Sequence, residues 1–220
     1  MPTIYEACVT SIAQAIAAER AGADRLELCT RISTGGLTPP VPRLVAVRDA
    51  VAIPIHVMIR PRAGDFSYSR AEVDRMRRAI GDAREAEADG VVLGLLTADG
   101  RVDARAFRAL APITRGLSIT CHRAFDELSA PLESMEELIE LGVDRILTSG
   151  GAPTARKGAD LLARLVAAAR GRIGIIACGR IRARHAAELV AATGVSEIHA
   201  HLKSTASMRA LARAVHAGTP

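Results

Sequence analysis

Residues 22–29 (GADRLELC) and 35–40 (GGLTPP) indicate the fold most clearly. The first stretch has the pattern of a short strand and the second that of the loop after it. Side chains alternate along a strand, so the two leucines share one face while Glu27 and Cys29 share the other. A carboxylate on one face of a buried strand is costly unless something uses it. We therefore expect the leucine face of this strand to pack in the core and the other face to contribute to a functional site.

The same pattern recurs along the chain. Residues 142–151 (GVDRILTSGG) repeat it closely, and 88–94 (ADGVVLG) and 194–199 (GVSEIH) are looser copies. Each follows a helix-like run. A recurring helix, tight turn, short apolar strand and polar loop is typical of a repeated β/α unit.

Eight such units can be identified. Strict alternation predicts a parallel sheet. Eight units predict an α/β fold that closes into a compact, single-domain (β/α)8 TIM barrel over residues 1–220. An open doubly wound sheet is the alternative, weakened because no GxGxxG turn follows the first strand. The expected strands are 3–8, 24–29, 53–59, 90–95, 117–121, 144–148, 173–177 and 197–200, and the expected helices 11–21, 42–50, 69–87, 103–110, 131–141, 158–169, 184–193 and 205–217.

The composition limits the function classes. Hydrophobic residues make up 49% of the 220, yet there is no Trp and there are only two Tyr and three Phe, so the core must be aliphatic. The formal charge of +5 would be compatible with a protein that binds nucleic acid. Acidic and basic residues alternate along the helices, which is typical of a solvated face. The chain also lacks the aromatic platforms of single-strand binders. We therefore expect no nucleic-acid partner.

Four cysteines lie far apart, without a C-x-x-C pair, and predict neither a zinc ribbon nor a disulfide framework. The first residues do not form a signal peptide, and no apolar run approaches membrane-spanning length. We expect a cytoplasmic protein with reduced thiols and no membrane partner. Aliphatic helix faces leave room for a homodimer.

In a TIM barrel the functional groups lie at the carboxyl ends of the strands. Cys8 and Cys29 end the first two strands, and Glu6 and Glu27 precede them by two residues. Strand parity predicts that the two cysteines lie side by side, with the two glutamates one layer below. Two thiolates suit Cu(I) or another thiophilic metal. The alternative is that both cysteines are small buried hydrophobic residues.

A second group combines carboxylates with histidines, which suits a divalent metal or acid–base chemistry on a carbonyl or sugar. The alternative is that the histidines are hydrogen-bonded in the barrel lining and that the glutamates pair with Arg60 or Arg123. The group is Glu6, Glu27, His122 and His199; the candidate catalytic residues are Glu6, Glu27, His122 and Arg123.

A third group suits an anionic ligand. Turns of small residues follow the sixth and seventh strands, where backbone N–H groups can hold a phosphate. Loop arginines add bidentate anion donors. The candidate anion-binding residues are Arg60, Arg62, Ser149, Gly150, Gly151 and Gly179, joined by Arg123.

Seven motifs spread from the first strand to the last resemble the CutC family, usually named copper homeostasis protein. RPRAGDF and HRAFD are the most specific of them. The motifs are 5–8 (YEAC), 24–29 (DRLELC), 35–39 (GGLTP), 58–66 (MIRPRAGDF), 122–126 (HRAFD), 147–151 (LTSGG) and 197–200 (EIHA).

The resemblance implies a cytoplasmic TIM barrel associated with copper tolerance. It also implies Cu(I) binding through two cysteines, which by position are Cys8 and Cys29. The chain departs from the family after the last strand, where His201-Leu202-Lys203 and a short helix replace a longer Gly- and Ser-containing segment. Two hypotheses follow: a Cu(I)-binding homeostasis protein, or an enzyme acting on a small anionic or phosphorylated metabolite.

Overall fold

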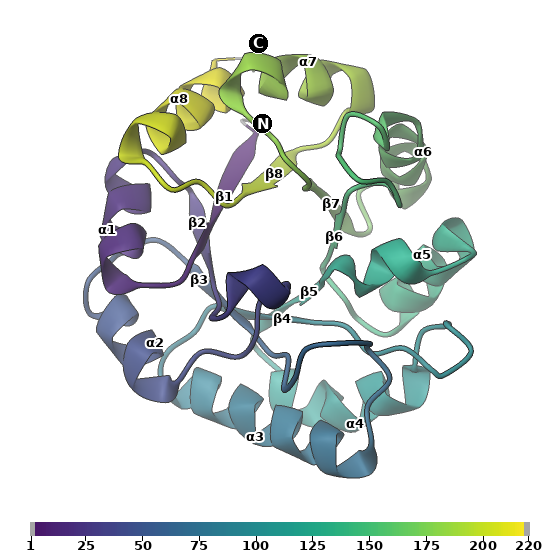
Figure 1. Cartoon of the computed structure of the whole chain (residues 1–220). Coiled ribbons are helices and arrows are strands. Elements are labelled where there is room, and N and C mark those ends of the chain that lie inside the picture. The colour runs from purple at the N-terminus through teal and green to yellow at the C-terminus, as the bar shows by residue number, and fades with distance from the viewer. Residues whose placement is uncertain (1–2, 218–220) are drawn as a thin grey trace.

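Eight parallel strands form a closed barrel in the computed structural model, which describes residues 3–217 (Figure 1). The strands follow one another around the barrel in sequence order, and β1 pairs with β8 to close it. This confirms the TIM barrel and excludes the open sheet; the predicted domain limits, residues 1 and 220, lie outside the described residues. The strands are β1 Ile4–Val9, β2 Arg25–Leu28, β3 Ile55–Met58, β4 Gly90–Leu93, β5 Ser118–Cys121, β6 Arg145–Thr148, β7 Gly174–Ala177 and β8 Glu197–Ala200.

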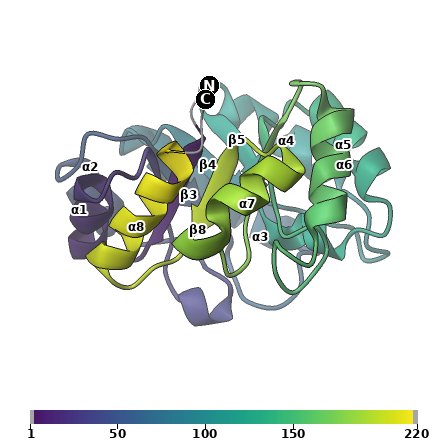
Figure 2. The same ribbon diagram turned by 90° about the horizontal axis from the view of Figure 1, so that it is seen from above.

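A helix follows each strand and packs on the outside of the barrel (Figures 1 and 2). Several helices begin at side-chain caps, such as Ser11 before α1 and Ser69 before α3. Ser69 accepts from the amide of Glu72, whose carboxylate accepts from the Ser69 amide, so a full capping box starts α3. The helices are α1 Ile12–Arg20, α2 Val41–Arg48, α3 Arg70–Glu85, α4 Ala104–Thr114, α5 Pro131–Glu140, α6 Ala159–Ala169, α7 Ala183–Thr193 and α8 Thr205–His216.

Two features of the helices differ from expectation. Helix α4 continues past Pro112 to Thr114, whose buried hydroxyl donates to the Ala111 carbonyl at 3.1 Å. Two 3-10 helices, η1 Ile32–Thr34 and η2 Arg123–Glu127, occupy loops after β2 and β5. Figures 1 and 2 place the short η1, which is dark blue in Figure 1 and pale violet in Figure 2, over the end of the barrel where the strands finish. It therefore lies where the site is expected.

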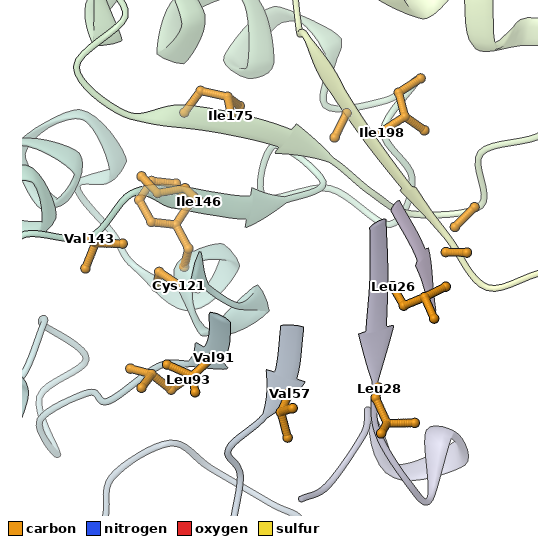
Figure 3. Packing of buried hydrophobic residues seen from close by; sticks show 14 of the residues in the cluster. Leu26, Leu28, Val57, Val91, Leu93, Cys121, Val143, Ile146, Ile175 and Ile198 are labelled. Carbon is orange, nitrogen blue, oxygen red and sulfur yellow. The ribbon is translucent and has the colours of Figure 1, made fainter. Parts of the chain in front are cut away.

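The outward faces of the strands build the core. Figure 3 shows aliphatic side chains of successive strands lying between the barrel and its helices, among them Leu26, Val57, Val91, Ile146 and Ile198. Each such side chain contributes about 1.5–3 kcal/mol when fully buried. The aliphatic core predicted from composition is confirmed, and it leaves the inward faces free for other residue types.

The helix surfaces bear on the predicted partners. No helix within residues 3–217 has the length and hydropathy needed to cross a bilayer. Ile12 on α1 and Val41 and Val45 on α2 are exposed large hydrophobic residues. They agree with the aliphatic faces inferred from sequence, and the homodimer stays a prediction.

Candidate functional site

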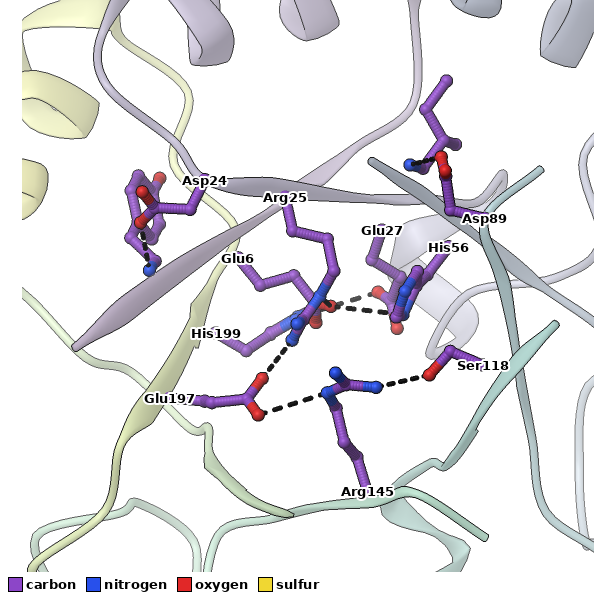
Figure 4. Close-up of polar contacts among 12 residues, drawn as sticks. Glu6, Asp24, Arg25, Glu27, His56, Asp89, Ser118, Arg145, Glu197 and His199 are labelled. Atoms are coloured by element: carbon purple, nitrogen blue, oxygen red, sulfur yellow. Dashed lines mark hydrogen bonds and ion pairs between the residues drawn. The ribbon is translucent and has the colours of Figure 1, made fainter. Parts of the chain in front are cut away.

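Charged side chains converge inside the barrel, where aliphatic residues would be the simplest filling. Figure 4 shows them reaching toward one another from β1, β2, β3, β6 and β8. Strand alternation explains the arrangement, because residues two apart return to the same inward face. The labelled residues that meet there are Glu6, Arg25, Glu27, His56, Arg145, Glu197 and His199.

Arg25 is the centre of an ion-pair network at the amino end of the barrel. Its Nε donates to Glu6 Oε2 at 2.6 Å, and a terminal nitrogen contacts Glu197. Glu197 also accepts from Arg145 Nε at 3.1 Å. The alternative interpretation paired Glu6 and Glu27 with Arg60 or Arg123, whereas the structure pairs Glu6 with Arg25 and brings Glu27 near His199. Arg25 lies two residues before Glu27 on the same face, so strand parity would have indicated it.

Glu6 and His199 form a charged pair above this network. Burial by itself raises the pKa of Glu6, but Arg25 and then His199 outweigh it and hold that pKa well below its usual range. Burial likewise lowers the pKa of His199, but Glu27 and Glu6 outweigh it and raise the pKa to about 9. Protonated His199 donates from Nδ1 to Glu6 at 2.8 Å, while its Nε2 lies 3.7 Å from Glu27. Glu6 therefore orients His199.

We expect His199→Gln to lower the free energy of unfolding most in mildly acidic solution. The folded pKa near 9 exceeds the unfolded value of 6.5. The stabilisation is then fully present below pH 6.5 and is lost as pH rises through 9. Its size is on the order of 3 kcal/mol. Urea unfolding of both proteins in metal-free buffer from pH 6 to 10 measures it, and a difference independent of pH would contradict it.

The two thiols predicted to be neighbours are neighbours. Cys8 Sγ lies 3.7 Å from Cys29 Sγ, and both side chains are buried with Met58 and Val92. The predicted layers need a correction. Cys8 is level with Glu27 in the β1–β2 ladder, and Glu6 is level with Arg25. The two strands are therefore displaced by two residues relative to the simple alignment, which the sequence did not reveal.

The Cys8 thiol is protonated in this environment. The hydrogen bond with Cys29, then burial and then Glu27 raise the pKa of Cys8 well above its usual value. One ligand atom each of Cys8, Glu27 and His199 lies within 4.8 Å of the others, which is compatible with a shared metal ion. A metal here would have to displace the thiol proton.

A cavity of about 350 Å³ opens beside the thiols at the carboxyl end of the barrel. Its wall combines soft, acidic and basic groups, and η1 contributes Ile32 and Thr34 to it. The polar and soft residues on the wall are Cys8, Glu27, Met58, Arg60, His122, Arg123 and His199. The structure thus brings most of the predicted catalytic and metal-binding residues to one place.

His122 and Arg60 stand against the same aromatic ring on this wall. The rings of His122 and Phe66 lie 4.8 Å apart, and the Arg60 guanidinium carbon lies 4.7 Å from the Phe66 centroid. Burial and then Arg60 lower the pKa of His122 to about 3, so the ring is neutral. A Cβ at Gly94 would lie 2.6 Å from the His122 ring, so only glycine leaves room for this ring position.

Arg62 does not share the cavity with Arg60. Its Nε donates to Glu72 at 2.7 Å, and its NH2 group donates to Asp65 at 2.8 Å. It also donates to the backbone carbonyls of residues 63, 65 and 67. The guanidinium is therefore committed to its own loop.

The amide cradle after β6 holds a carboxylate of the chain itself. The amides of Ser149 and Gly151 donate to Asp126 Oδ1 at 3.1 Å, and the Gly150 amide donates to the Thr148 hydroxyl at 2.9 Å. Arg123 Nε donates to the same Asp126 at 2.8 Å. Asp126 thus stands where an anion was expected. Sequence reasoning missed this role because a carboxylate and an amide cradle 23 residues apart give no local signal.

Gly179 borders this cradle, since a Cβ at this position would lie 3.0 Å from the Cβ of Ser149. It lines two further cavities, of about 410 Å³ and 260 Å³, together with Arg180. One of them also includes Arg123 and His199, so it adjoins the 350 Å³ cavity. The predicted anion-binding residues therefore do not form one site: Arg60 and Arg123 line the 350 Å³ cavity, Arg62 pairs with acidic residues away from it, and Gly179 borders the cradle that Asp126 occupies.

Comparison with known proteins agrees with the sequence motifs. A family model described as the CutC family matches residues 3–204. The human protein named copper homeostasis protein cutC homolog is 43% identical over 202 residues, covering 92% of this chain and 74% of that protein. A CutC family protein of Rhizobium meliloti (strain 1021) is 46% identical over 199 residues, covering 90% of this chain and 81% of that protein.

Solved structures give the same result. A crystal structure described as the putative copper homeostasis protein CutC from Streptococcus agalactiae superposes with a TM-score of 0.86 at 32% identity, covering 90% of this chain and 97% of that one. Thiamine phosphate pyrophosphorylase from Pyrococcus furiosus superposes with a TM-score of 0.69 at 18% identity, covering 99% and 97% of the two chains. The latter similarity shows the shared barrel fold alone.

Proposed function

We propose that this chain, which belongs to the CutC family, takes part in copper homeostasis. In this proposal it binds one Cu(I) ion between Cys8 and Cys29. The observation that most directly supports this proposal is the distance of 3.7 Å between the two sulfur atoms. Metal–thiolate bonds of about 2.3 Å, the length found with zinc, span separations of up to about 4.6 Å. A metal can therefore bond both sulfurs without movement of the strands.

The surroundings of the thiols suit a soft ion. Cu(I) prefers thiolate and thioether sulfur to carboxylate oxygen. Met58 packs in the same buried cluster as Cys8 and Cys29, and its thioether is a further soft group. Glu27 and His199 also lie near Cys8 and suit a harder ion. The chemistry of the donors thus favours Cys8 and Cys29 for copper.

We expect Cys8→Ser/Cys29→Ser to lose tight Cu(I) binding, with affinity falling more than about 100-fold, since losing an outer-shell partner alone costs about 10–100-fold. Competition titration against a Cu(I) chelator under reducing conditions measures this. Cys178→Ser is the matched control, because Cys178 is equally buried but packs with Leu147 and Ile176 instead. Copper binding that is unaffected by the double substitution would overturn the proposal.

We place the protein in the cytoplasm. Cys8, Cys29, Cys121 and Cys178 are all free thiols. A Cu(I) site of two thiols has to stay reduced to work, and the cytoplasm keeps thiols reduced. The proposed cytoplasmic location therefore agrees with the proposed pair of thiol ligands.

A second candidate function is an enzyme acting on a small anionic metabolite. The supporting observation is the 350 Å³ cavity, on whose wall buried polar atoms lack partners. Glu27 and His122 are placed to transfer protons there, and Arg60 and Arg123 to attract the anion. Glu6 and Arg62 are not on this wall, so we give Glu6 a positioning role through His199. Product formation from a small anion, lost in Glu27→Gln, tests this function.

A further inference from the structure

Three residues that line the 350 Å³ cavity each carry a buried polar atom with no hydrogen-bond partner among residues 3–217: Glu27 Oε1, Arg60 Nε and His122 Nε2. Their residues are only 3%, 6% and 4% exposed. Each unpaired buried polar group costs about 1–3 kcal/mol. Three of them around one cavity are accounted for if a ligand supplies the missing partners.

Arg60 brings an uncompensated charge to the cavity. Its terminal nitrogens donate to the backbone carbonyls of Thr34 at 2.8 Å, Gly36 at 3.3 Å and Gly64 at 2.7 Å. These three bonds fix the guanidinium and leave Nε free. No carboxylate of the described chain lies within ion-pair distance of it. A buried cation without a counter-ion favours an anionic ligand.

His122 adds a second hydrogen-bond donor, and its proton can be assigned to one of the two ring nitrogens. Its Nδ1 accepts from the amide of Ala124 at 3.2 Å, so that nitrogen carries no proton. The proton of a neutral imidazole then lies on Nε2. His122 Nε2 and Arg60 Nε are thus two N–H donors beside Phe66. Two donors suit the two oxygens of a carboxylate.

The wall of this cavity is less suited to a phosphate than to a carboxylate. Phosphate sites in such barrels depend on backbone amides of the late loops. Here the amides of Ser149 and Gly151 already bind Asp126. The cavity therefore offers side-chain donors without the amide cradle that a phosphate uses.

Glu27 supplies the remaining polar group. Its Oε2 faces His199 at 3.7 Å, and its Oε1 has no partner. An acceptor oxygen in a cavity that attracts a carboxylate requires a donor on the same ligand, since a second carboxylate would be repelled. A hydroxyl group meets this requirement.

We propose that this cavity binds a small hydroxycarboxylic acid, whose carboxylate accepts from Arg60 Nε and His122 Nε2 and whose hydroxyl donates to Glu27 Oε1. The inference deepens the second proposed function and rests on it for its biological meaning. A volume of 350 Å³ is at the lower end of small-molecule sites, which favours a short acid.

Isothermal titration of the copper-free full chain with glycerate, propanoate and glycerol tests the site. We expect glycerate to bind about tenfold more tightly than propanoate, because propanoate leaves Glu27 unpaired, and glycerol to bind least. His122→Asn retains an acceptor for the Ala124 amide but loses the Nε2 donor, and Arg60→Lys retains the charge but loses Nε. Each of these substitutions should weaken glycerate binding at least about tenfold. Glu27→Gln should reduce the preference for glycerate over propanoate.

Arg77→Lys and His216→Asn are the matched controls, because both residues lie off the cavity wall and pair with acidic residues elsewhere. They should bind glycerate like the wild type. No glycerate binding by the wild type, or equal binding in His122→Asn and Arg60→Lys with both folded by circular dichroism, would overturn the site. Binding without product formation would support the site and count against the enzyme. Product formation unaffected by both substitutions would support the enzyme and overturn the site.

Discussion

Replacing Arg25 with methionine is expected to lower the free energy of unfolding by about 3–5 kcal/mol. Arg25 is the partner of both Glu6 and Glu197 inside the barrel. Glu6 is 1% exposed, so without Arg25 its charge is left with His199 and with the more distant His56, whose Nδ1 lies 3.9 Å away. Removing one member of a buried ion pair leaves the other charge uncompensated, and that desolvation is the source of the loss. Urea unfolding at pH 7, followed by circular dichroism, measures it.

Arg77→Met is the matched control for Arg25→Met. Arg77 pairs with Asp74 on α3, where both side chains are exposed, and surface pairs contribute about 1 kcal/mol or less. Adding Glu6→Gln to Arg25→Met should restore part of the stability, because it removes one stranded charge. If Arg25→Met costs no more than Arg77→Met, or if Glu6→Gln adds a further full loss, the network does not stabilise the barrel as described.

Replacing Gly158 with alanine is expected to cost about 3 kcal/mol. A Cβ at this position would overlap the carbonyl oxygen of Ser149 and lie 2.8 Å from the Cα of Gly150. Both neighbours are backbone, so neither moves aside as a side chain would. The clash falls on the loop whose amides hold Asp126, and the loop has to open to relieve it. Thermal and urea unfolding report the loss.

Gly81→Ala controls for the gain of a methyl group. Gly81 lies within α3, and a Cβ there meets no atom within 4 Å. Alanine is favoured over glycine in a helix by up to about 1 kcal/mol, so this substitution should stabilise the protein. Equal effects of the two substitutions would show that the loop after β6 is not closed tightly on Gly158.

Much of the fold could be predicted because its causes are local. The alternation of short apolar strands with helical runs indicated eight β/α units, and all eight strands are present. The spacing of Ser69 and Glu72 is that of a capping box, which depends on four consecutive residues only, and the box is present. The two 3-10 helices were missed because such short segments carry no periodic pattern of their own.

The candidate site was predictable to the extent that it depends on strand alternation. Cys8 and Cys29 end neighbouring strands with the same parity, so their contact followed from the sequence and is confirmed at 3.7 Å. The two-residue displacement that sets Glu27 level with Cys8 did not follow. Register between parallel strands depends on how the whole barrel closes, and no single strand records it.

The sequence by itself determined the barrel, its aliphatic core and the two thiols at its mouth, because repetition and alternation are properties of the chain read along its length. Only the tertiary structure decided which charges meet. It paired Glu6 with Arg25, placed Asp126 in the amide cradle, and turned Arg60 and His122 toward one cavity. These contacts join residues from different β/α units, and their geometry depends on loop paths and strand register that no local pattern encodes.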